Sequence, residues 1–193
     1  MIFVVVGKSG VGKDTIINNY LKKNDNITKV TQYTTRPMRA DEVNGKEYNF
    51  ISDEEFDILL SENKFCCVEK YQVANGDTWK YAVKIEDLKK YDNCILTCNP
   101  KSIVKLNLLF NWCELTVIEI KAELIKRVER YLKRDNYTME NVNELVRRFI
   151  KDEEDFINVM PKVKIENNDN IEDALKQFDK TIRRHSNGKT KSR

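Results

Sequence analysis

Residues 2–15 read IFVVVGKSGVGKDT, and this stretch predicts a strand, a tight turn and the start of a helix. The run from Ile2 to Val6 is continuous, β-branched and aromatic, which is typical of a strand buried on both faces of a parallel sheet. The spacing GxxxxGK then runs from Gly7 to Lys13 and leads into a helical segment that reaches about Lys23. A buried strand, a glycine-rich turn and a helix in this order predict a phosphate-binding loop, or P-loop.

The chemistry of the loop suits the terminal phosphates of a nucleotide. Glycines allow positive φ angles and bring successive N–H groups toward one anion, and the helix N-terminus adds partial positive charge. The ammonium of Lys13 is expected to reach the β and γ phosphates. An ordinary glycine-rich turn is the alternative, and the spacing together with Lys13 argues against it. The residues predicted to bind the nucleotide are Gly7, Lys8, Ser9, Gly10, Val11, Gly12, Lys13, Asp14 and Thr15.

One position of the loop departs from the usual pattern. Asp14 stands where the pattern has Ser or Thr, whose hydroxyl ligates Mg²⁺, and Thr15 follows one place later. A carboxylate is also a hard oxygen ligand for Mg²⁺, although it adds negative charge beside the phosphates. Either Asp14 holds the metal, directly or through water, or Thr15 supplies the hydroxyl, and both alternatives stay open.

Composition excludes several classes of protein. The chain of 193 residues is long enough for one domain with a small insertion, and its net charge of +3 is too even to indicate bulk binding of nucleic acid or membrane. The sequence contains no apolar run of about 20 residues, as a membrane span requires, and no export signal. The single histidine, His185, excludes a multi-histidine metal site, and the five cysteines show no CxxC pair. We therefore expect a cytoplasmic protein, a monomer or homodimer, whose partners are small-molecule nucleotides.

Strand-like and helix-like segments alternate along most of the chain. Strands are expected near 94–98, 115–120 and 163–165, and helices near 122–134, 139–157 and 171–184. This alternation predicts an α/β fold with a three-layer parallel sheet. The middle of the chain has denser turn signals, with strands expected at 48–51 and 65–73 and a helix at 53–62.

These patterns divide the chain into four regions. Residues 1–32 and 84–184 are expected to form the P-loop core, with a helical lid near 130–142. Residues 33–83 are expected to form a small mixed α/β insertion that binds a second substrate. Residues 185–193 are polar and basic, and we expect them to be a disordered tail.

A second basic constellation lies at the start of the insertion. Arg36 and Arg39 flank Pro37 and Met38, so that both guanidinium groups could converge on one anion. Two unrelated arginines on a solvated loop are the alternative. The turn and strand that follow are expected to place Tyr48 near the same anion.

The residues at these two places resemble the guanylate kinase family. The resemblance rests on GKSGVGKDT at 7–15 and TTRPMRADEVNGKEYNFIS at 34–52, continues in ISDEEFDILLSENKF at 51–65, and is weak between 66 and 120. It implies a P-loop parallel sheet with an inserted substrate-binding region and a mobile lid. It also implies transfer of a phosphoryl group from ATP to GMP with Mg²⁺, as part of purine nucleotide metabolism.

The resemblance also implies roles for individual residues. Arg36, Arg39, Tyr48 and Tyr81 would hold the phosphate of the acceptor, and a late segment ending in Asn168 would contact ATP. Family members present a Glu to the guanine edge. Without a gap that position falls on Cys67, and Glu69 lies two residues further on. We favour Glu69, because a carboxylate accepts hydrogen bonds from N1–H and N2–H of guanine and a cysteine does not replace that acceptor pair.

A third basic set lies on the two helices around the expected lid. The spacing of Arg127, Arg130 and Arg134 places them on one helix face, and Arg148 follows on the next helix. Arginines of this kind stabilise charge on the moving phosphoryl group after the lid has closed. The alternative is a solvated face with the i,i+4 pairs Glu123–Arg127 and Glu144–Arg148. The residues expected to act in catalysis are Lys13, Arg36, Arg134 and Arg148.

The sequence therefore predicts an ATP-dependent kinase acting on a nucleoside monophosphate, with GMP or dGMP as the acceptor. Two alternatives remain at this point. One is a kinase for a different phosphorylated acceptor, such as another nucleotide or a ribose phosphate. The other is a non-catalytic binding module of the same fold, which the intact loop residues Gly7, Gly12 and Lys13 argue against.

Overall fold

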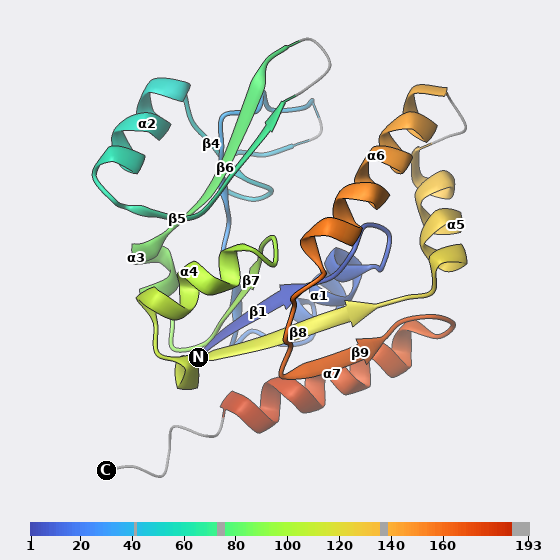
Figure 1. The fold of residues 1–193 in the computed structure, drawn as a ribbon. Coiled ribbons are helices and arrows are strands. Elements are labelled where there is room, and N and C mark those ends of the chain that lie inside the picture. Colours follow the sequence, from blue (N-terminus) through green and yellow to red (C-terminus); the bar gives the residue numbers. More distant parts are fainter. Residues whose placement is uncertain (41, 73–75, 136–138, 187–193) are drawn as a thin grey trace, which may run out of the picture.

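The computed structural model describes residues 1–40, 42–72, 76–135 and 139–186, with the backbone alone for residues 134–135 and 139–141. Its centre is a parallel five-stranded sheet in the order β2-β7-β1-β8-β9 (Figure 1). All five residues of β1 are buried, and the strand lies between β7 and β8. The predicted central strand is therefore confirmed. The bounds are β1 (Ile2–Val6), β2 (Thr28–Lys29), β7 (Cys94–Thr97), β8 (Leu115–Lys121) and β9 (Val163–Glu166).

Helices cover both faces of this sheet, because successive residues of a buried strand point to opposite sides. On one face Phe3 and Val5 pack with helices α1 (Lys13–Leu21) and α7 (Ile171–Ser186). Tyr20 and Phe178 join these helices, with ring centroids 5.2 Å apart. On the other face Val4 and its neighbours pack against Leu88 of α3 (Ile85–Lys89) and Leu106 of α4 (Ser102–Leu109). A short 3₁₀ helix, Trp112–Glu114, precedes β8.

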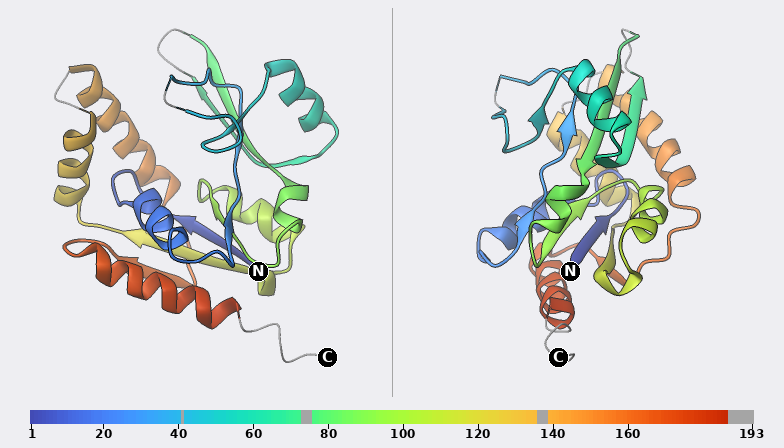
Figure 2. Two further views of the ribbon diagram at one scale, coloured as in Figure 1. Left: turned by 180° about the vertical axis from the view of Figure 1, so that it is seen from behind. Right: turned by 90° about the vertical axis from the view of Figure 1, so that its left-hand side faces the viewer.

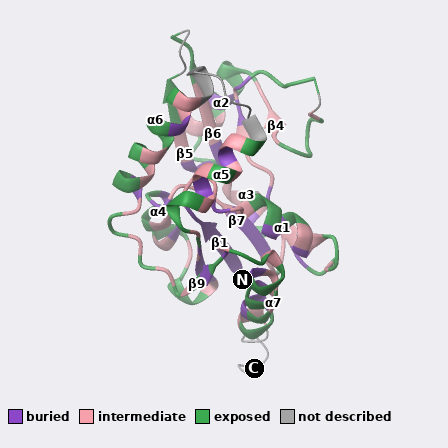
Figure 3. Cartoon of the chain, turned by 90° about the vertical axis from the view of Figure 1, so that its right-hand side faces the viewer, coloured by how far each residue is buried: buried purple, intermediate pink, exposed green. Residues whose placement is uncertain are grey.

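The three-layer α/β core is thus as predicted, and the views from behind and from the side show the layers (Figure 2). Buried residues gather in the central strands (Figure 3). Helix α7 continues to Ser186, so that His185 and Ser186, which the sequence assigned to the tail, are helical. The remaining tail residues, 187–193, lie outside the described part of the chain.

A second, smaller sheet in the order β4-β3-β6-β5 joins the core through Cys66, Cys67 and Val83. Phe56 of helix α2 packs on Phe65 at the start of β5, with ring centroids 4.8 Å apart. The strand β6 was not predicted, because lysines at 80 and 84 interrupt its apolar pattern. The bounds are β3 (Tyr33–Thr34), β4 (Asn49–Phe50), α2 (Asp53–Ser61), β5 (Phe65–Gln72) and β6 (Thr78–Lys84).

A β-bulge interrupts the pairing of β5 with β6. Cys66 pairs with Val83 whereas Glu69 pairs with Tyr81, so β5 holds one extra residue between these two pairs. Cys67 lies at the bulge with φ 52°, and its side chain is buried in the core cluster. The bulge therefore separates the environments of Cys67 and Glu69.

Helices α5 (Leu124–Asp135) and α6 (Met139–Asp155) lie side by side above the carboxyl ends of the core strands (Figures 1 and 2). They stand across the P-loop from the second sheet. Both helices were predicted from the sequence; residues 136–138, in the expected lid, lie outside the described residues. Within the described part of the chain, no helix is long and apolar enough to cross a membrane.

Candidate active site

The P-loop connects β1 to α1 and is shaped by two glycines with positive φ. Gly10 has φ 80° and Gly12 has φ 88°, values that side chains disfavour. A Cβ atom on Gly12 would lie 2.7 Å from Nδ2 of Asn167, which itself donates to the carbonyl of Val11 at 2.8 Å. The buried Asn167 therefore braces the loop from the end of β9. The sequence pointed to its neighbour Asn168, whose Oδ1 instead accepts from the backbone N–H of Glu123 at 2.8 Å.

Lys13 lies across this loop. Its Nζ donates to the carbonyl oxygen of Gly7 at 2.7 Å. Burial lowers the pKa of Lys13, and the carboxylates of Asp14 and Asp152 partly oppose that shift. The ammonium is thus held over the loop in an electrostatic environment that favours the arrival of further negative charge.

An arginine of α5 and an aspartate of α6 contact the same loop. Nε of Arg127 donates to the carbonyl of Ser9 at 2.8 Å, and its guanidinium lies 4.3 Å from the ring centroid of Phe149. The same guanidinium forms a 2.8 Å ion pair with Asp152 of α6, and the backbone N–H of Ser9 donates to that carboxylate at 2.7 Å. A carboxylate therefore accepts from one of the N–H groups expected to bind phosphate.

The other arginines of α5 and α6 have separate positions. Arg130 donates to the backbone oxygens of Asn167 at 2.7 Å and Asn168 at 3.1 Å, so it supports the segment beside the loop. Arg148 pairs with Glu144 at 2.6 Å, which is the i,i+4 pair named above as the alternative to a catalytic role. Hydrogen bonds from Arg147 and then Arg148 lower the pKa of Glu144 to about 2. The side chain of Arg134 lies outside the described residues.

On the second sheet, Arg36 is buried among aromatic rings. Its guanidinium donates to Glu42 Oε1 at 2.6 Å and lies 5.4 Å from the ring centroids of both Tyr48 and Phe50. The structure thus brings Arg36 and Tyr48 together, as the sequence predicted. The backbone N–H of Arg39 donates to the same Glu42 at 2.8 Å, whereas the residue itself is exposed.

A row of tyrosines continues from Tyr48 toward Glu69. The ring centroid of Tyr81 lies 5.7 Å from that of Tyr48 and 5.5 Å from that of Tyr71. Glu69 Oε1 accepts from the backbone N–H of Asn99 at 2.9 Å, and its Oε2 accepts from the hydroxyl of Tyr71. Glu69 is thus part of this polar row, while Cys67 packs into the core.

A cavity of about 150 Å³ lies between the P-loop and Tyr48, the member of the second group that lines it. Lys13 and Asp14 line one side, and Lys46, Glu47 and Tyr48 line the other. Asp14 also pairs with Lys29 at 3.1 Å, whereas Thr15 is not among the lining residues. The described residues contain no group of three or more His, Cys, Asp or Glu that could by itself hold a metal ion. A single exposed carboxylate beside the loop fits a Mg²⁺ that keeps most of its ligands from water and phosphates.

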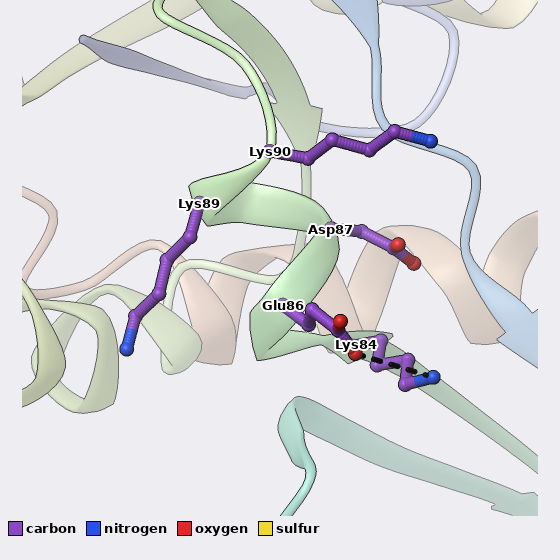
Figure 4. Close-up of a pocket in the computed structure, with 5 residues that line it drawn as sticks. All are labelled: Lys84, Glu86, Asp87, Lys89 and Lys90. Atoms are coloured by element: carbon purple, nitrogen blue, oxygen red, sulfur yellow. Dashed lines mark ion pairs between the residues drawn. The ribbon is translucent and has the colours of Figure 1, made fainter.

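A second hollow lies around α3, away from the P-loop (Figure 4). The side chains of Lys89 and Lys90 point in different directions, and Lys84 pairs with Glu86 at 3.6 Å. Because these charges do not converge, the hollow offers no site for an anion. The cleft beside Lys13 is therefore the candidate active site.

Sequence patterns did not single out several residues that complete the site. They reach the site from distant parts of the chain: Asp152, Asn167, Tyr71 and Asn99. For Arg127, the sequence spacing suggested Glu123 as the ion-pair partner, whereas the structure pairs it with Asp152. One signal could have indicated two of these residues. Asn167 and Asn99 follow soon after β9 and β7, and ligands of parallel sheets bind beyond the carboxyl ends of the strands.

The phosphate-binding loop lies on a parallel sheet and faces Tyr48, which packs beside Arg36, across one cleft. This arrangement defines a P-loop kinase of a small phosphorylated acceptor. Comparison with known proteins then identifies the family. The family model described as guanylate kinase matches residues 1–185, and the chain belongs to the guanylate kinase family.

Individual relatives agree with this assignment. The chain is 32% identical to the guanylate kinase of Malacoplasma penetrans (strain HF-2) over 167 residues, which are 81% of this chain and 83% of the relative. A shorter match, 49% identical over 55 residues, covers 28% of this chain and 27% of the guanylate kinase of Thermotoga maritima. The crystal structure of guanylate kinase from Anaplasma phagocytophilum superposes on this structure with a TM-score of 0.66. The match covers 98% of this chain and 87% of that chain at 20% sequence identity. The two proteins therefore share a fold.

Proposed function

We propose that this protein transfers the γ-phosphoryl group of ATP to GMP or dGMP and forms the diphosphate. The observation that carries the proposal is the cleft in which Lys13 and Asp14 of the P-loop face Tyr48 of the second sheet. Donor and acceptor phosphates bound on its two sides would lie next to one another. Membership of the guanylate kinase family supports this acceptor over other phosphorylated compounds.

The donor side would hold ATP through backbone N–H groups of residues 7–15 and the ammonium of Lys13. Asp14, which lines the cleft, is the stronger candidate than Thr15 to contact a nucleotide-bound Mg²⁺. When bound, Mg²⁺ neutralises charge on the β and γ phosphates. Asn168 is proposed to contact the nucleotide beside the loop.

The acceptor side would hold the phosphate of GMP through Arg36, Tyr48 and Tyr81. Arg36 now donates to Glu42, and its planar fork suits a phosphate as well as a carboxylate. Arg39 is exposed and is proposed to add a second guanidinium to the bound phosphate.

Glu69 rather than Cys67 is proposed to recognise the guanine edge. The Glu69 carboxylate belongs to the polar row with Tyr71 and Asn99, whereas the Cys67 thiol is buried in the core. A hydrogen bond with Cys66 lowers the pKa of this thiol, but a hydrogen bond with Cys98 together with burial outweighs it and raises the pKa. An anionic acceptor pair complements the two adjacent N–H donors of guanine.

The chemistry requires positioning and charge neutralisation more than covalent work. An oxygen of the acceptor phosphate attacks the γ-phosphorus, and the bond from that phosphorus to the bridging oxygen of ADP breaks. The attacking group is already anionic, so no strong general base is needed. Arg134 and Arg148 are proposed to approach the moving group when α5 and α6 close over the cleft.

The test is Lys13→Ala, with Lys23→Ala at an exposed position after α1 as the matched control. ATP consumption is measured with GMP, dGMP, AMP, UMP and ribose 5-phosphate. We expect GMP and dGMP to be the preferred acceptors, a loss of at least about a hundredfold in kcat/KM for Lys13→Ala, and no change in the control. Preference for a non-guanine acceptor, or full activity of Lys13→Ala, would reject the proposal.

A further inference from the structure

We propose that Tyr71 is a positioning residue that sets base specificity by holding the Glu69 carboxylate in place; this inference rests on the proposed function. The hydroxyl of Tyr71 donates to Oε2 of Glu69, while the backbone N–H of Asn99 donates to Oε1 at 2.9 Å. Both oxygens of the carboxylate therefore have a partner before any base arrives.

The backbone of β5 creates this arrangement. Glu69 and Tyr71 are two residues apart on one strand, so their side chains leave the same face of the sheet. The bulge at Cys67 shifts the register, so that Glu69 is paired with Tyr81. The extra residue of β5 therefore gives the carboxylate its place beside the tyrosine row.

The two residues that donate to Glu69, Tyr71 and Asn99, are each fixed by further contacts. The ring of Tyr71 packs edge-on against Tyr81 at 5.5 Å and 78°. Tyr71 is 37% exposed. Partial burial of its hydroxyl, followed by the charge of Glu69, raises its pKa further above neutrality, so the hydroxyl stays protonated as a donor. The amide of Asn99 donates to Asp155 of α6 at 2.6 Å, and Asp155 pairs with Lys101 at 2.6 Å.

A carboxylate held in this way retains one acceptor lone pair on each oxygen. Guanine offers N1–H and the 2-amino group as two adjacent donors, hypoxanthine offers N1–H alone, and adenine presents an acceptor at N1. A fixed pair of acceptors therefore favours GMP over IMP and IMP over AMP. If the carboxylate rotated freely, the second hydrogen bond would be weakened and the preference for GMP over IMP would fall.

The variant Tyr71→Phe removes the hydroxyl and keeps the ring. We expect KM for GMP to rise about tenfold, as for loss of a charged hydrogen bond, with kcat and KM for ATP unchanged. The ratio of kcat/KM for GMP to that for IMP should fall several-fold. Tyr91→Phe, at a tyrosine outside the site, is the matched control, and equal melting temperatures would show that both variants are folded.

A double-mutant cycle separates positioning from a general effect on the pocket. If Tyr71 acts through Glu69, then Tyr71→Phe should change KM for GMP very little in a Glu69→Gln background. An unchanged KM and GMP/IMP ratio in Tyr71→Phe, or full additivity of the two substitutions, would overturn the inference. Absence of GMP-dependent ATP consumption in the unaltered protein would instead reject the proposed function itself.

Discussion

Arg36 shows how a single side chain can be prepared for an anion. The side chain is 6% exposed and that of Glu42 is 11% exposed, so the ion pair is largely removed from solvent. A hydrogen bond from Arg36 lowers the pKa of Glu42, and the same bond raises the pKa of Arg36. The guanidinium is thus fully charged and lies against two aromatic rings, where an incoming phosphate would compete with Glu42 for its N–H groups.

The variant Arg36→Ala should therefore raise KM for GMP by about a hundredfold, since charged hydrogen bonds contribute about 1.5–3 kcal/mol each. The affinity for ATP should stay close to that of the unaltered protein, because Arg36 lies on the second sheet and not on the P-loop. Steady-state kinetics with GMP measures this KM, and isothermal titration with ATP measures the Kd for ATP. Equal loss of ATP and GMP affinity would contradict this division of roles.

Lys13 predicts a pH dependence at the other side of the cleft. Burial lowers its pKa, so the ammonium loses its proton at a lower pH than an exposed lysine does. Only the charged form attracts phosphate, and bound phosphate in turn favours protonation. The affinity for ATP should therefore fall as pH rises through this lowered pKa, and binding in that range should take up a proton.

Titration of ATP in two buffers of different ionisation enthalpy measures this proton uptake directly. The variant Lys13→Arg is the control, because a guanidinium keeps its charge throughout this range. Proton uptake of equal size in the variant and the unaltered protein would assign the effect to another group.

Helix α6 contacts both sides of the cleft through residues one turn apart. Asp152 accepts from the backbone N–H of Ser9, and Asp155 accepts from the amide of Asn99, which in turn holds Glu69. Residues three apart lie on one face of a helix. The helix thus touches the donor loop and the acceptor pocket through one acidic face.

The contact of Asp152 with the loop predicts that this carboxylate opposes phosphate binding. Asp152→Asn removes one negative charge close to the phosphate site and should tighten inorganic tripolyphosphate about fivefold, corresponding to about 1 kcal/mol of repulsion at a solvated site. Glu154→Gln, at an exposed position of α6, is the matched control. Weaker binding by Asp152→Asn would show that its support of Arg127 outweighs the repulsion.

At the scale of the molecule, the candidate active site lies between two sheets and the pair α5–α6 (Figures 1 and 2). The P-loop follows the end of β1 of the core sheet, and the proposed acceptor residues Arg36, Tyr48 and Glu69 lie in the second sheet and its flanking segments. Substrates bound to the P-loop and to the second sheet at the same time would bridge these two parts of the molecule, which face each other across the cleft.

A ligand with adenosine and guanosine linked by five phosphates should therefore stabilise the protein more than ATP or GMP alone at equal concentration. A ligand that binds the folded state stabilises it by about 2.7 kcal/mol at a hundred times its Kd, and linking two binding groups lowers Kd. Thermal unfolding with each ligand measures the shift. A shift no larger than that with ATP would argue against simultaneous occupation of both sides.

The P-loop, the central strand and most core helices could be predicted because their signals are local. Glycine spacing and a run of apolar residues fix the conformation from Ile2 to Lys13 within a few neighbouring positions. Strand β6 was missed because Lys80 and Lys84 interrupt its apolar residues. The different environments of Cys67 and Glu69 arise from the bulge in β5, which no local pattern indicated.

Local patterns in the chain thus established the α/β class, the donor loop and the basic turn at Arg36. The tertiary structure alone paired Ser9 with Asp152, 143 positions away, and joined Asn99 to Glu69, 30 positions away. Such contacts depend on which elements pack together and on their register. A hydrogen bond between distant residues leaves no periodicity in either segment, so it becomes visible only when the chain has folded.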